Sequence, residues 1–205
     1  MNVVKEIKER CPEIRAGVNL IPIVPFLTDD EQSMEDVVSG ARNAGADFIL
    51  FGGGMTLRDN QAAWFLERLS QEFPHLVEKY EELYQGKYTP EEGYQGRYEH
   101  ERSYSRRINK KVLELCRKYG LAFRLKRYIP ADFRKQNYLV AQKLLDDSYL
   151  AQMTGKPWTK TFWAGQNINN LSESIEDIVR RNELRKIRNV DASIEEYVLN
   201  FLKSG

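Results

Sequence analysis

Two short, nearly uninterrupted apolar segments stand out in the first quarter of the chain, from Ala16 to Leu27 and from Asp47 to Phe51. Each is too short to cross a membrane and too uniform for a strand with one face in water. The pattern therefore predicts two strands buried on both faces. Pro22 and Pro25 have no amide hydrogen to donate, so we expect regular pairing to fail near the end of the first strand. A bent edge strand is the alternative.

Between these segments the apolar positions change to helical spacing. Ser33-Met-Glu-Asp36 resembles a capping box at the start of this helix, and Gly45 ends it. Strand, helix and strand with short links form a βαβ unit, which predicts parallel strands and a right-handed crossover. Ligands of such sheets bind beyond the carboxyl ends of the strands, where the loops are residues 25–31 and 52–59. The triple glycine Gly52–Gly54 permits close backbone approach to a ligand, or simply a sharp turn.

The remaining pattern is mostly helical. Apolar periodicity predicts helices over residues 3–10, 59–84, 108–120 and 137–153, and two closing helices that begin near Ser172 and Ser193. A short strand is possible over residues 122–125. Residues 84–104 contain a near-repeat, YQGKY and YQGRY, without apolar periodicity, and we interpret them as a surface loop. The expected fold class is α/β, with a βαβ unit of about two parallel strands followed by a mostly α-helical carboxyl-terminal region.

With 41% apolar and 30% charged residues among 205, the chain has the composition of a soluble globular protein. Its 31 Lys and Arg nearly balance its 30 Asp and Glu, so bulk charge steers it towards neither nucleic acid nor membrane. Cys11 and Cys116 lie far apart in a sequence with no apolar signal segment, which favours a cytoplasmic location, without a membrane partner or a disulfide framework. With His75 and His100 they are too few to hold a structural zinc or a cysteine-bound iron–sulfur cluster.

Three segments resemble the carboxyl-terminal half of radical SAM proteins. They are residues 17–30 (GVNLIPIVPFLTDD), residues 45–58 (GADFILFGGGMTLR), and residues 109–120 with the later RYIP of residues 127–130. The most similar subgroup is the one named for spore photoproduct lyase and often labelled DNA repair photolyase. The likeness covers roughly residues 10–155 and fades beyond them.

The resemblance implies a partial six-stranded (β/α) barrel that holds a 4Fe–4S cluster and S-adenosylmethionine, whose reductive cleavage gives a hydrogen-abstracting adenosyl radical. Residues 1–70 would be the carboxyl-terminal part of that barrel, residues 71–155 a helical, Tyr-rich basic extension, and residues 156–205 a helical hairpin. By resemblance, the first strand would contact the adenosyl group and the second loop would border the adenine. The alternative is that these residues only fill the barrel. The implied cofactor-binding residues are Ile23, Val24, Pro25, Gly53, Gly54 and Met55.

The chain departs from this family in its cysteines. The family's cluster is held by three cysteines in a CxxxCxxC loop, and the sequence has no such triplet. We therefore expect this chain alone to bind no cofactor and to cleave no S-adenosylmethionine. Two strands that are apolar on both faces would leave bare edges, so a missing amino-terminal barrel half or a second copy of the chain is the expected partner. A natural truncation, an engineered fragment and a split subunit all remain open.

A second functional hypothesis rests on residues 84–138, which carry 14 Lys or Arg against 6 Asp or Glu and eight of the 11 tyrosines. Basic side chains neutralise phosphates and aromatic faces stack on unpaired bases, so the stretch is compatible with single-stranded nucleic acid. The chain would then be a non-enzymatic module that binds nucleic acid or a partner protein. A solvated basic helix docked by its tyrosines is the alternative. The candidate contacts are Arg102, Arg106, Arg107, Lys110, Lys111, Arg117 and Lys118.

Overall fold

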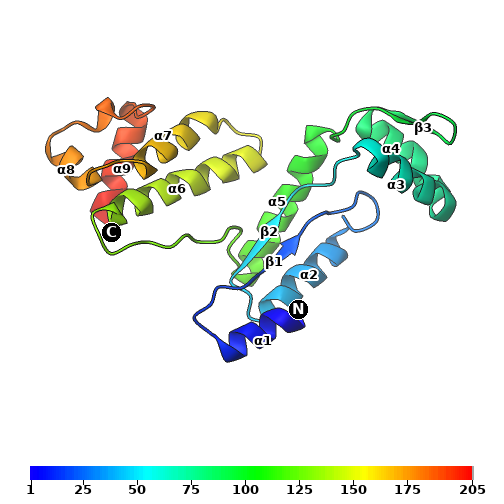
Figure 1. Cartoon of the computed structure of the whole chain (residues 1–205), viewed down its shortest axis with the longest axis horizontal. Coiled ribbons are helices and arrows are strands. Elements are labelled where there is room, and N and C mark those ends of the chain that lie inside the picture. Colours follow the sequence, from blue (N-terminus) through cyan, green and yellow to red (C-terminus); the bar gives the residue numbers. More distant parts are fainter. Residues whose placement is uncertain (205) are drawn as a thin grey trace. The chain divides into compact units, whose positions relative to one another are not determined.

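The computed structural model describes residues 1–204 and consists of two compact units, Met1–Leu125 and the residues from Lys126 onward. Figure 1 shows the chain coloured from its blue amino terminus to its red carboxyl terminus. Neither boundary expected from the sequence, after residue 70 or after residue 155, coincides with this division. Residues beyond 70 belong to the first unit because α5 (Arg102–Tyr119) packs on α2 (Glu31–Asn43) and on the parallel sheet.

The amino-terminal unit is organised around this two-stranded parallel sheet. β1 (Gly17–Leu20) leads through α2 into β2 (Phe48–Phe51), and the register places Gly17 opposite Phe48 and Leu20 opposite Phe51. The predicted βαβ unit and the parallel direction of its strands are confirmed. β1 ends just before Pro22, as expected from a residue with no amide hydrogen.

Helix α2 begins after Asp30 rather than at Ser33. Asp30 Oδ1 accepts a hydrogen bond from the Ser33 amide at 2.9 Å, and hydrogen bonds from Ser33 hold the pKa of the Asp30 carboxyl below its usual value. The expected start at Ser33 is therefore wrong, because an earlier carboxylate satisfies the free amides of the first turn. Gly45 follows the helix with a φ of 81°, which agrees with its predicted role.

The sheet is covered by helices on one face. α2 packs on β1, α5 packs on β2, and the two helices pack on each other. Ile49 and Phe51 point to this covered face and are 0% and 3% exposed, whereas Asn19 is exposed and Leu50 is 37% exposed. The expectation that both faces are buried is therefore wrong. Alternate residues of each strand face opposite sides, and within the described residues only one side carries packed crossover helices.

The possible strand over residues 122–125 is reduced to one parallel bridge beside β2. The Ile49 amide donates to the Ala122 carbonyl oxygen at 2.8 Å, and the Ala122 amide donates to Asp47 O at 3.4 Å. The spatial order β1, β2, Ala122 follows the chain order. The helix after β1 and the helix before Ala122 pack on each other and on the same face of the sheet, whereas a doubly wound sheet has helices on both faces.

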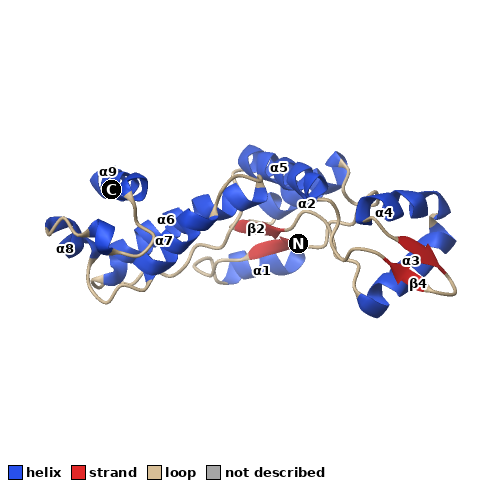
Figure 2. Cartoon of the chain, turned by 90° about the horizontal axis from the view of Figure 1, so that it is seen from above, coloured by secondary structure: helices blue, strands red, loops and turns tan. Residues whose placement is uncertain are grey.

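A helical insert with its own small core separates β2 from α5. It contains α3 (Asp59–Glu72), the 3₁₀ turn η1 (Pro74–Leu76), α4 (Val77–Tyr84), and the antiparallel hairpin of β3 (Lys87–Thr89) and β4 (Gly93–Gln95), which lies beside α3 and α4 in Figure 2. We call residues 58–97 the insert. Its core consists of Ala62, Leu66, Leu69, Leu76, Tyr80 and Tyr84, and Leu57 from the preceding loop packs with them.

The hairpin replaces the surface loop expected for the near-repeat. Gly86 and Gly96 face each other, and a side chain on either would overlap the Tyr94 ring. At the base of the hairpin the Tyr94 hydroxyl donates to Arg97 O at 2.9 Å and to Tyr84 O, on the opposite side, at 3.4 Å. Glycine and tyrosine, rather than alternating apolar residues, thus stabilise these strands, which is why apolar periodicity did not reveal them.

Helix α1 (Asn2–Arg10) confirms the helix predicted over residues 3–10. Lys8 Nζ donates to Asp47 Oδ2 at 3.0 Å, and the same oxygen accepts a hydrogen bond from the Ala16 amide at 2.9 Å. Asp47 precedes β2 and Ala16 precedes β1. One carboxylate therefore ties α1 to the start of both strands.

The carboxyl-terminal unit is a helical bundle of α6 (Arg134–Met153), α7 (Thr159–Asn169), α8 (Ile175–Arg180), the 3₁₀ turn η2 (Leu184–Lys186) and α9 (Ala192–Ser204). Its core includes Leu144, Ala164, Ile168, Ile175 and Val198. α7 has no counterpart among the expected helices. α9 is capped by Asp191, whose Oδ1 accepts from the Ser193 and Ile194 amides, both at 3.1 Å. Among residues 1–204, no helix combines the length and the apolar character needed to cross a membrane.

Candidate functional site

A pocket of about 540 Å³ opens at the carboxyl ends of β1 and β2. Parallel sheets with one-sided winding bind ligands at this edge, and the volume is typical of small-molecule sites. We call it the edge pocket. It is lined by Ile21 and Pro22 after β1, residues 52–56 after β2, Gln61 of α3, and Glu99, His100, Arg102 and Ser105 around the start of α5.

The structure divides the six implied cofactor-binding residues into two groups. Gly53, Gly54 and Met55 line the edge pocket. The other three lie outside its lining: Ile23 is 0% exposed, Pro25 is buried and Val24 is half-buried. After β1 the chain bends, and these side chains are directed towards the protein interior. Ile21 and Pro22 are therefore the residues of this loop that line the pocket. Contact of Ile23, Val24 and Pro25 with an adenosyl group stays a prediction.

The triple glycine forms the sharp turn considered for it, and its close approach to a ligand stays a prediction. Gly54 has a φ of 114°, a conformation that other residues rarely adopt, and lies against the His100 ring. A Cβ at Gly53 would lie 2.5 Å from the carbonyl oxygen of Ser105. The loop after β2 therefore turns sharply and also packs directly on the first turn of α5, which leaves the backbone of residues 52–54 as the floor of the edge pocket.

Glu99, His100 and Ser105 form a polar wall that sequence reasoning missed. The Leu57 amide donates to Tyr98 O at 2.9 Å, and Thr56 bridges Glu99 in antiparallel fashion. This pairing returns the end of the insert to the loop after β2. No local sequence motif indicates such a contact between segments about 40 residues apart. Arg102, which was considered for nucleic acid, also lines the pocket.

Both loops of the pocket accept hydrogen bonds from buried tyrosines. Tyr80 donates to Pro25 O at 2.5 Å and Tyr84 donates to Met55 O at 2.7 Å. Tyr104 donates to Asp29 Oδ2 at 3.0 Å. Burial raises the pKa of each of these three hydroxyls well above its ordinary value, because it disfavours the charged phenolate.

The acidic run that follows the first loop is used structurally. Asp29 Oδ1 accepts from the amide of Phe26, which has a φ of 62°, at 2.9 Å, and Asp29 Oδ2 lies 3.6 Å from Arg107. Asp30 caps α2, and Glu31 pairs with Lys111 at 2.6 Å. These carboxylates hold the loop and α2 against α5 and are not directed into the edge pocket's lining.

The seven candidate nucleic-acid contacts separate into two faces of α5. Arg107, Lys111 and Lys118 pair with Asp29, Glu31 and Glu35 respectively. The other four are exposed and form no ion pair within the part of the chain that the structure describes. At 100° per residue they fall within about 80° of the helix circumference. We call them the basic stripe: Arg102, Arg106, Lys110 and Arg117.

The tyrosines of residues 84–138 also divide. Tyr84 and Tyr104 are 0% and 6% exposed and dock the insert and α5 on the loops of the edge pocket. Tyr98 and Tyr128 are 49% and 83% exposed. The exposed rings are accessible for stacking on a base. The buried pair instead has the structural role considered as the alternative, because these two tyrosines attach helices to the body of the protein.

The donor set of this chain does not fit a 4Fe–4S cluster. Cys116 is buried, and burial raises the pKa of its thiol to about 11, which disfavours the thiolate that a cluster requires. Cys11 is half-buried at the end of α1. Among the described residues, no three His, Cys, Asp or Glu side chains gather in a way that could hold a metal ion.

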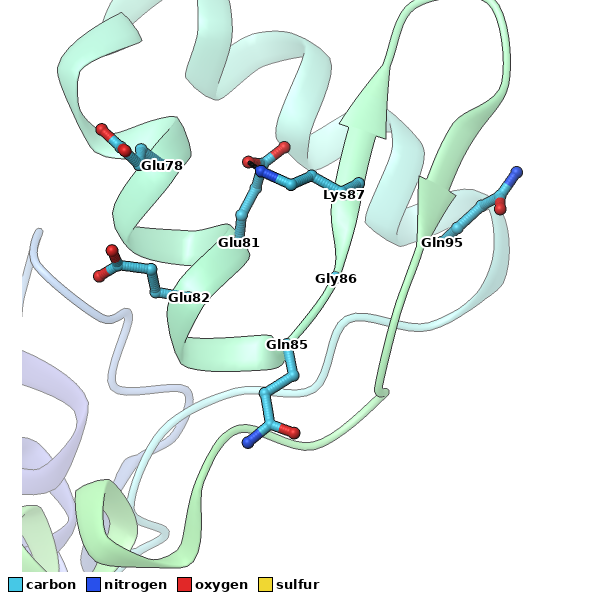
Figure 3. A pocket seen from close by; sticks show the side chains of 7 residues that line it. All are labelled: Glu78, Glu81, Glu82, Gln85, Gly86, Lys87 and Gln95. Atoms are coloured by element: carbon cyan, nitrogen blue, oxygen red, sulfur yellow. Dashed lines mark hydrogen bonds and ion pairs between the residues drawn. The ribbon is translucent and has the colours of Figure 1, made fainter.

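A second hollow, between α4 and the hairpin, is lined mainly by acidic side chains of α4. Figure 3 shows the Lys87 amino group directed at the Glu81 carboxylate, with Glu78 and Glu82 on the same helix. Lys87 Nζ lies 2.6 Å from Glu81 Oε2, and the Tyr88 amide donates to Glu81 Oε1 at 2.9 Å. Glu81 is therefore occupied in attaching β3 to α4.

Comparison with known proteins gives partial relatives only. No family model and no solved structure matches the chain. Proteins of Mycobacterium bovis and of two strains of Mycobacterium tuberculosis, each described as an uncharacterized protein, are 32% identical to it over 82 residues. The match covers 40% of this chain and 24% of each relative, so the chain spans about a quarter of the length of these curated relatives.

Proposed function

We propose that the edge pocket binds the adenosyl part of S-adenosylmethionine, and that the amino-terminal unit is the carboxyl-terminal portion of the partial barrel of a radical SAM protein of the photolyase-like subgroup. The observation that carries this proposal is the position of Gly53, Gly54 and Met55. These residues, which the resemblance assigns to the border of the adenine, line a pocket at the carboxyl ends of two parallel strands. The one-sided winding of the sheet supports it as well.

The residues of the edge pocket fit an adenosyl group. The backbone of residues 52–54 lets a flat ring approach closely, and Ile21, Pro22 and Met55 offer apolar surface. Glu99 and Arg102 offer an acceptor and a donor for hydroxyl or charged groups of the ligand. When bound beside a reduced cluster, S-adenosylmethionine supplies a hydrogen-abstracting radical. The role of this chain is to bind and orient the adenosyl group and to shield one side of it from water.

The cluster would be held by a companion polypeptide, because this chain lacks the thiols for it. The outer edge of β1 is where further barrel strands would continue the sheet, and the uncovered face with Phe48 and Leu50 would then point into the barrel. On this proposal the chain is a cytoplasmic fragment or subunit that is inactive alone.

Co-expression with a polypeptide that carries a CxxxCxxC loop and the first four strands of such a barrel tests the proposal. We expect 5′-deoxyadenosine to form from S-adenosylmethionine under anaerobic reduction only when both polypeptides are present. Thr56→Trp, which fills the pocket from an exposed position, should lower the rate about tenfold or more. Thr159→Trp, at an exposed position in the other unit, is the control. An assembled pair with an intact cluster and no product would refute the proposal.

A second candidate function is favoured by the basic stripe. Its four cations are exposed and unpaired within the described chain, whereas their neighbours on α5 are neutralised by Asp29, Glu31 and Glu35. Unpaired cations on one helix face attract the phosphates of a nucleic acid and release its counterions. We propose that the stripe binds the backbone of a single strand, with a base stacking on the side of the exposed Tyr98 ring opposite the Arg58 guanidinium, which lies 5.5 Å from the ring centre.

Fluorescence anisotropy with a labelled oligothymidine between 50 and 200 mM salt, roughly the range over which phosphate contacts are screened, tests the stripe. Arg106→Ala with Lys110→Ala should weaken binding and flatten the plot of log affinity against log salt by about 0.7 per lost contact. The matched control is Lys111→Ala with Lys118→Ala, which removes two cations already paired with α2. Equal effects of the two double variants, or binding that ignores salt, would rule out the stripe as the binding surface.

A further inference from the structure

The two loops that form the edge pocket are held from behind by hydroxyl groups of neighbouring helices. α4 contributes Tyr80, whose hydroxyl lies 2.5 Å from Pro25 O, and Tyr84, whose hydroxyl lies 2.7 Å from Met55 O. α5 contributes Tyr104, which reaches the Asp29 carboxylate. All three side chains are at most 6% exposed. Each loop is thus held at a backbone carbonyl by a hydroxyl of a buried side chain.

The same tyrosines belong to one aromatic cluster. The rings of Tyr80 and Tyr84 are parallel within 1°, with centroids 6.0 Å apart. The His100 ring lies edge-on to Tyr84 at 5.8 Å and to Tyr104 at 5.0 Å, and His100 itself lines the edge pocket. The loop after β1, the loop after β2 and the polar wall of the pocket are therefore in contact through a single rigid group.

We propose that Tyr80, Tyr84 and Tyr104 are positioning residues that hold the two loops of the edge pocket in their ligand-binding conformation. The insert, which supplies Tyr80 and Tyr84, then acts as a brace for a site to which it adds little lining of its own. The inference rests on the proposed function, because it takes the ligand of this pocket to be S-adenosylmethionine.

The geometry of the peptide bond shows what Tyr84 controls. In a trans peptide the carbonyl and the following amide hydrogen point in opposite directions. Because Tyr84 holds the carbonyl of Met55, the amide hydrogen of Thr56 is directed away from Tyr84. Thr56 lines the pocket, so the tyrosine hydroxyl constrains the backbone orientation of a residue of the pocket wall.

The loop after β2 needs such an anchor because it begins with three glycines. Glycine loses more conformational freedom on ordering than any other residue, and a ligand that had to order this loop would lose affinity by that amount. A buried hydroxyl that orders the loop before binding removes this loss.

Amide hydrogen exchange in Tyr80→Phe and Tyr84→Phe tests the brace without any ligand. The reporters for the loop after β1 are the amides of Phe26 and Thr28, which donate to Asp29 Oδ1 and Val24 O, both at 2.9 Å. The reporters for the loop after β2 are the amides of Gly54 and Leu57, which donate to Gly52 O and Tyr98 O, both at 2.9 Å. We expect Tyr80→Phe to accelerate exchange about tenfold in the first loop only, and Tyr84→Phe in the second only.

Tyr94→Phe is the matched control, because its hydroxyl also donates to backbone carbonyls, those of Arg97 at 2.9 Å and of Tyr84 at 3.4 Å, but to neither loop of the edge pocket. It should leave both loops unchanged. The amide of Ile49, bonded to Ala122 O at 2.8 Å, reports whether the sheet is intact. If Tyr84→Phe accelerates the Ile49 amide as much as the loop, or accelerates neither, the tyrosine contributes only general stability and the positioning role is refuted.

In the assembled pair of polypeptides, Tyr84→Phe should raise the KM for S-adenosylmethionine about tenfold with little change in kcat, and Tyr94→Phe should change neither. An unchanged KM in Tyr84→Phe, despite a loosened loop, would also refute the role in ligand binding. Loop-specific acceleration of exchange in a pair that forms no product even with the unmodified chain would instead refute the proposed function and leave the brace intact.

Discussion

Gly52 and Gly53 are adjacent in the sequence and differ in what surrounds them. A Cβ on Gly53 would lie 2.5 Å from the Ser105 carbonyl oxygen and 2.9 Å from its Cα, both backbone atoms of α5. A Cβ on Gly52 would have its nearest neighbour, the Ile21 side chain, at 4.0 Å. The run of three glycines therefore contains one position that tolerates a side chain and one at which the helix excludes it.

We expect Gly53→Ala to lower the free energy of unfolding by about 2 kcal/mol, because backbone atoms of α5 must move to admit the methyl group. Gly52→Ala should change it by less than about 0.5 kcal/mol, since the space is free and the φ angle is ordinary. Urea unfolding of the two variants measures the difference. Equal losses would show that the loop does not pack on α5 as described.

At the scale of elements, Asp47 is the point at which α1 and the two strands are joined. Burial alone would raise the pKa of its carboxyl, but the hydrogen bonds from the Ala16 amide and Lys8 outweigh this and leave the pKa below its ordinary value. The charged form is thus favoured by the folded state more than by the unfolded chain. Stability contributed by Asp47 is present above the unfolded pKa of 3.8 and is lost as the pH falls through the folded value.

Unfolding free energies measured by urea between about pH 5 and pH 2.5 should therefore fall more steeply in the unmodified chain than in Asp47→Asn, which cannot titrate. At pH 5 the variant should be the less stable of the two, and the difference should shrink towards low pH. Asp36→Asn is the control, because it removes an exposed carboxylate of α2 that accepts a hydrogen bond from the Gln32 side chain at 2.7 Å and does not contact the strands. A pH-independent difference would contradict the linkage.

The elements that sequence patterns predict well are those whose signal is local. The two apolar runs, the helical spacing between them and Pro22 were enough to predict a parallel βαβ unit and the end of β1. The hairpin was missed because its strands depend on contacts between Gly86, Gly96 and Tyr94 rather than on alternation. The sequence predicted that the triple glycine lies at the site. It did not predict the polar wall, because neither segment contains a local pattern that indicates the pairing of residues 56 and 99.

At the scale of the molecule, the amino-terminal unit has a sheet with crossover helices on one face and an outer edge at β1. Leu50, on the other face, is 37% exposed, and Asn19 beside it is exposed as well. Unpaired strand edges and uncovered apolar faces favour association with another chain. The partner expected from the sequence, a missing barrel half or a second copy, stays a prediction. The edge of β1 and the uncovered face of the sheet are the surfaces that such a partner would contact.

We expect the molar mass of the chain, measured by light scattering after gel filtration, to rise with concentration. Leu50→Gln should weaken this association about tenfold, because it replaces apolar contact surface at the uncovered face. Val3→Gln, at a position that is 69% exposed on α1, is the control for a general effect of surface hydrophobicity. A chain that stays monomeric at every concentration would contradict self-association.

The hydrogen bond from the Leu57 amide to Tyr98 O closes the insert at its base. The two ends of a long excursion therefore lie side by side, so that residues 58–97 could be excised and a short turn grafted in their place without stretching the backbone. Such a shortened chain would keep the triple glycine but lose the tyrosines behind it. The insert could therefore be replaced by another segment whose ends lie equally close together. Such a replacement would change what supports the loops of the edge pocket and leave β1 and β2 unaltered.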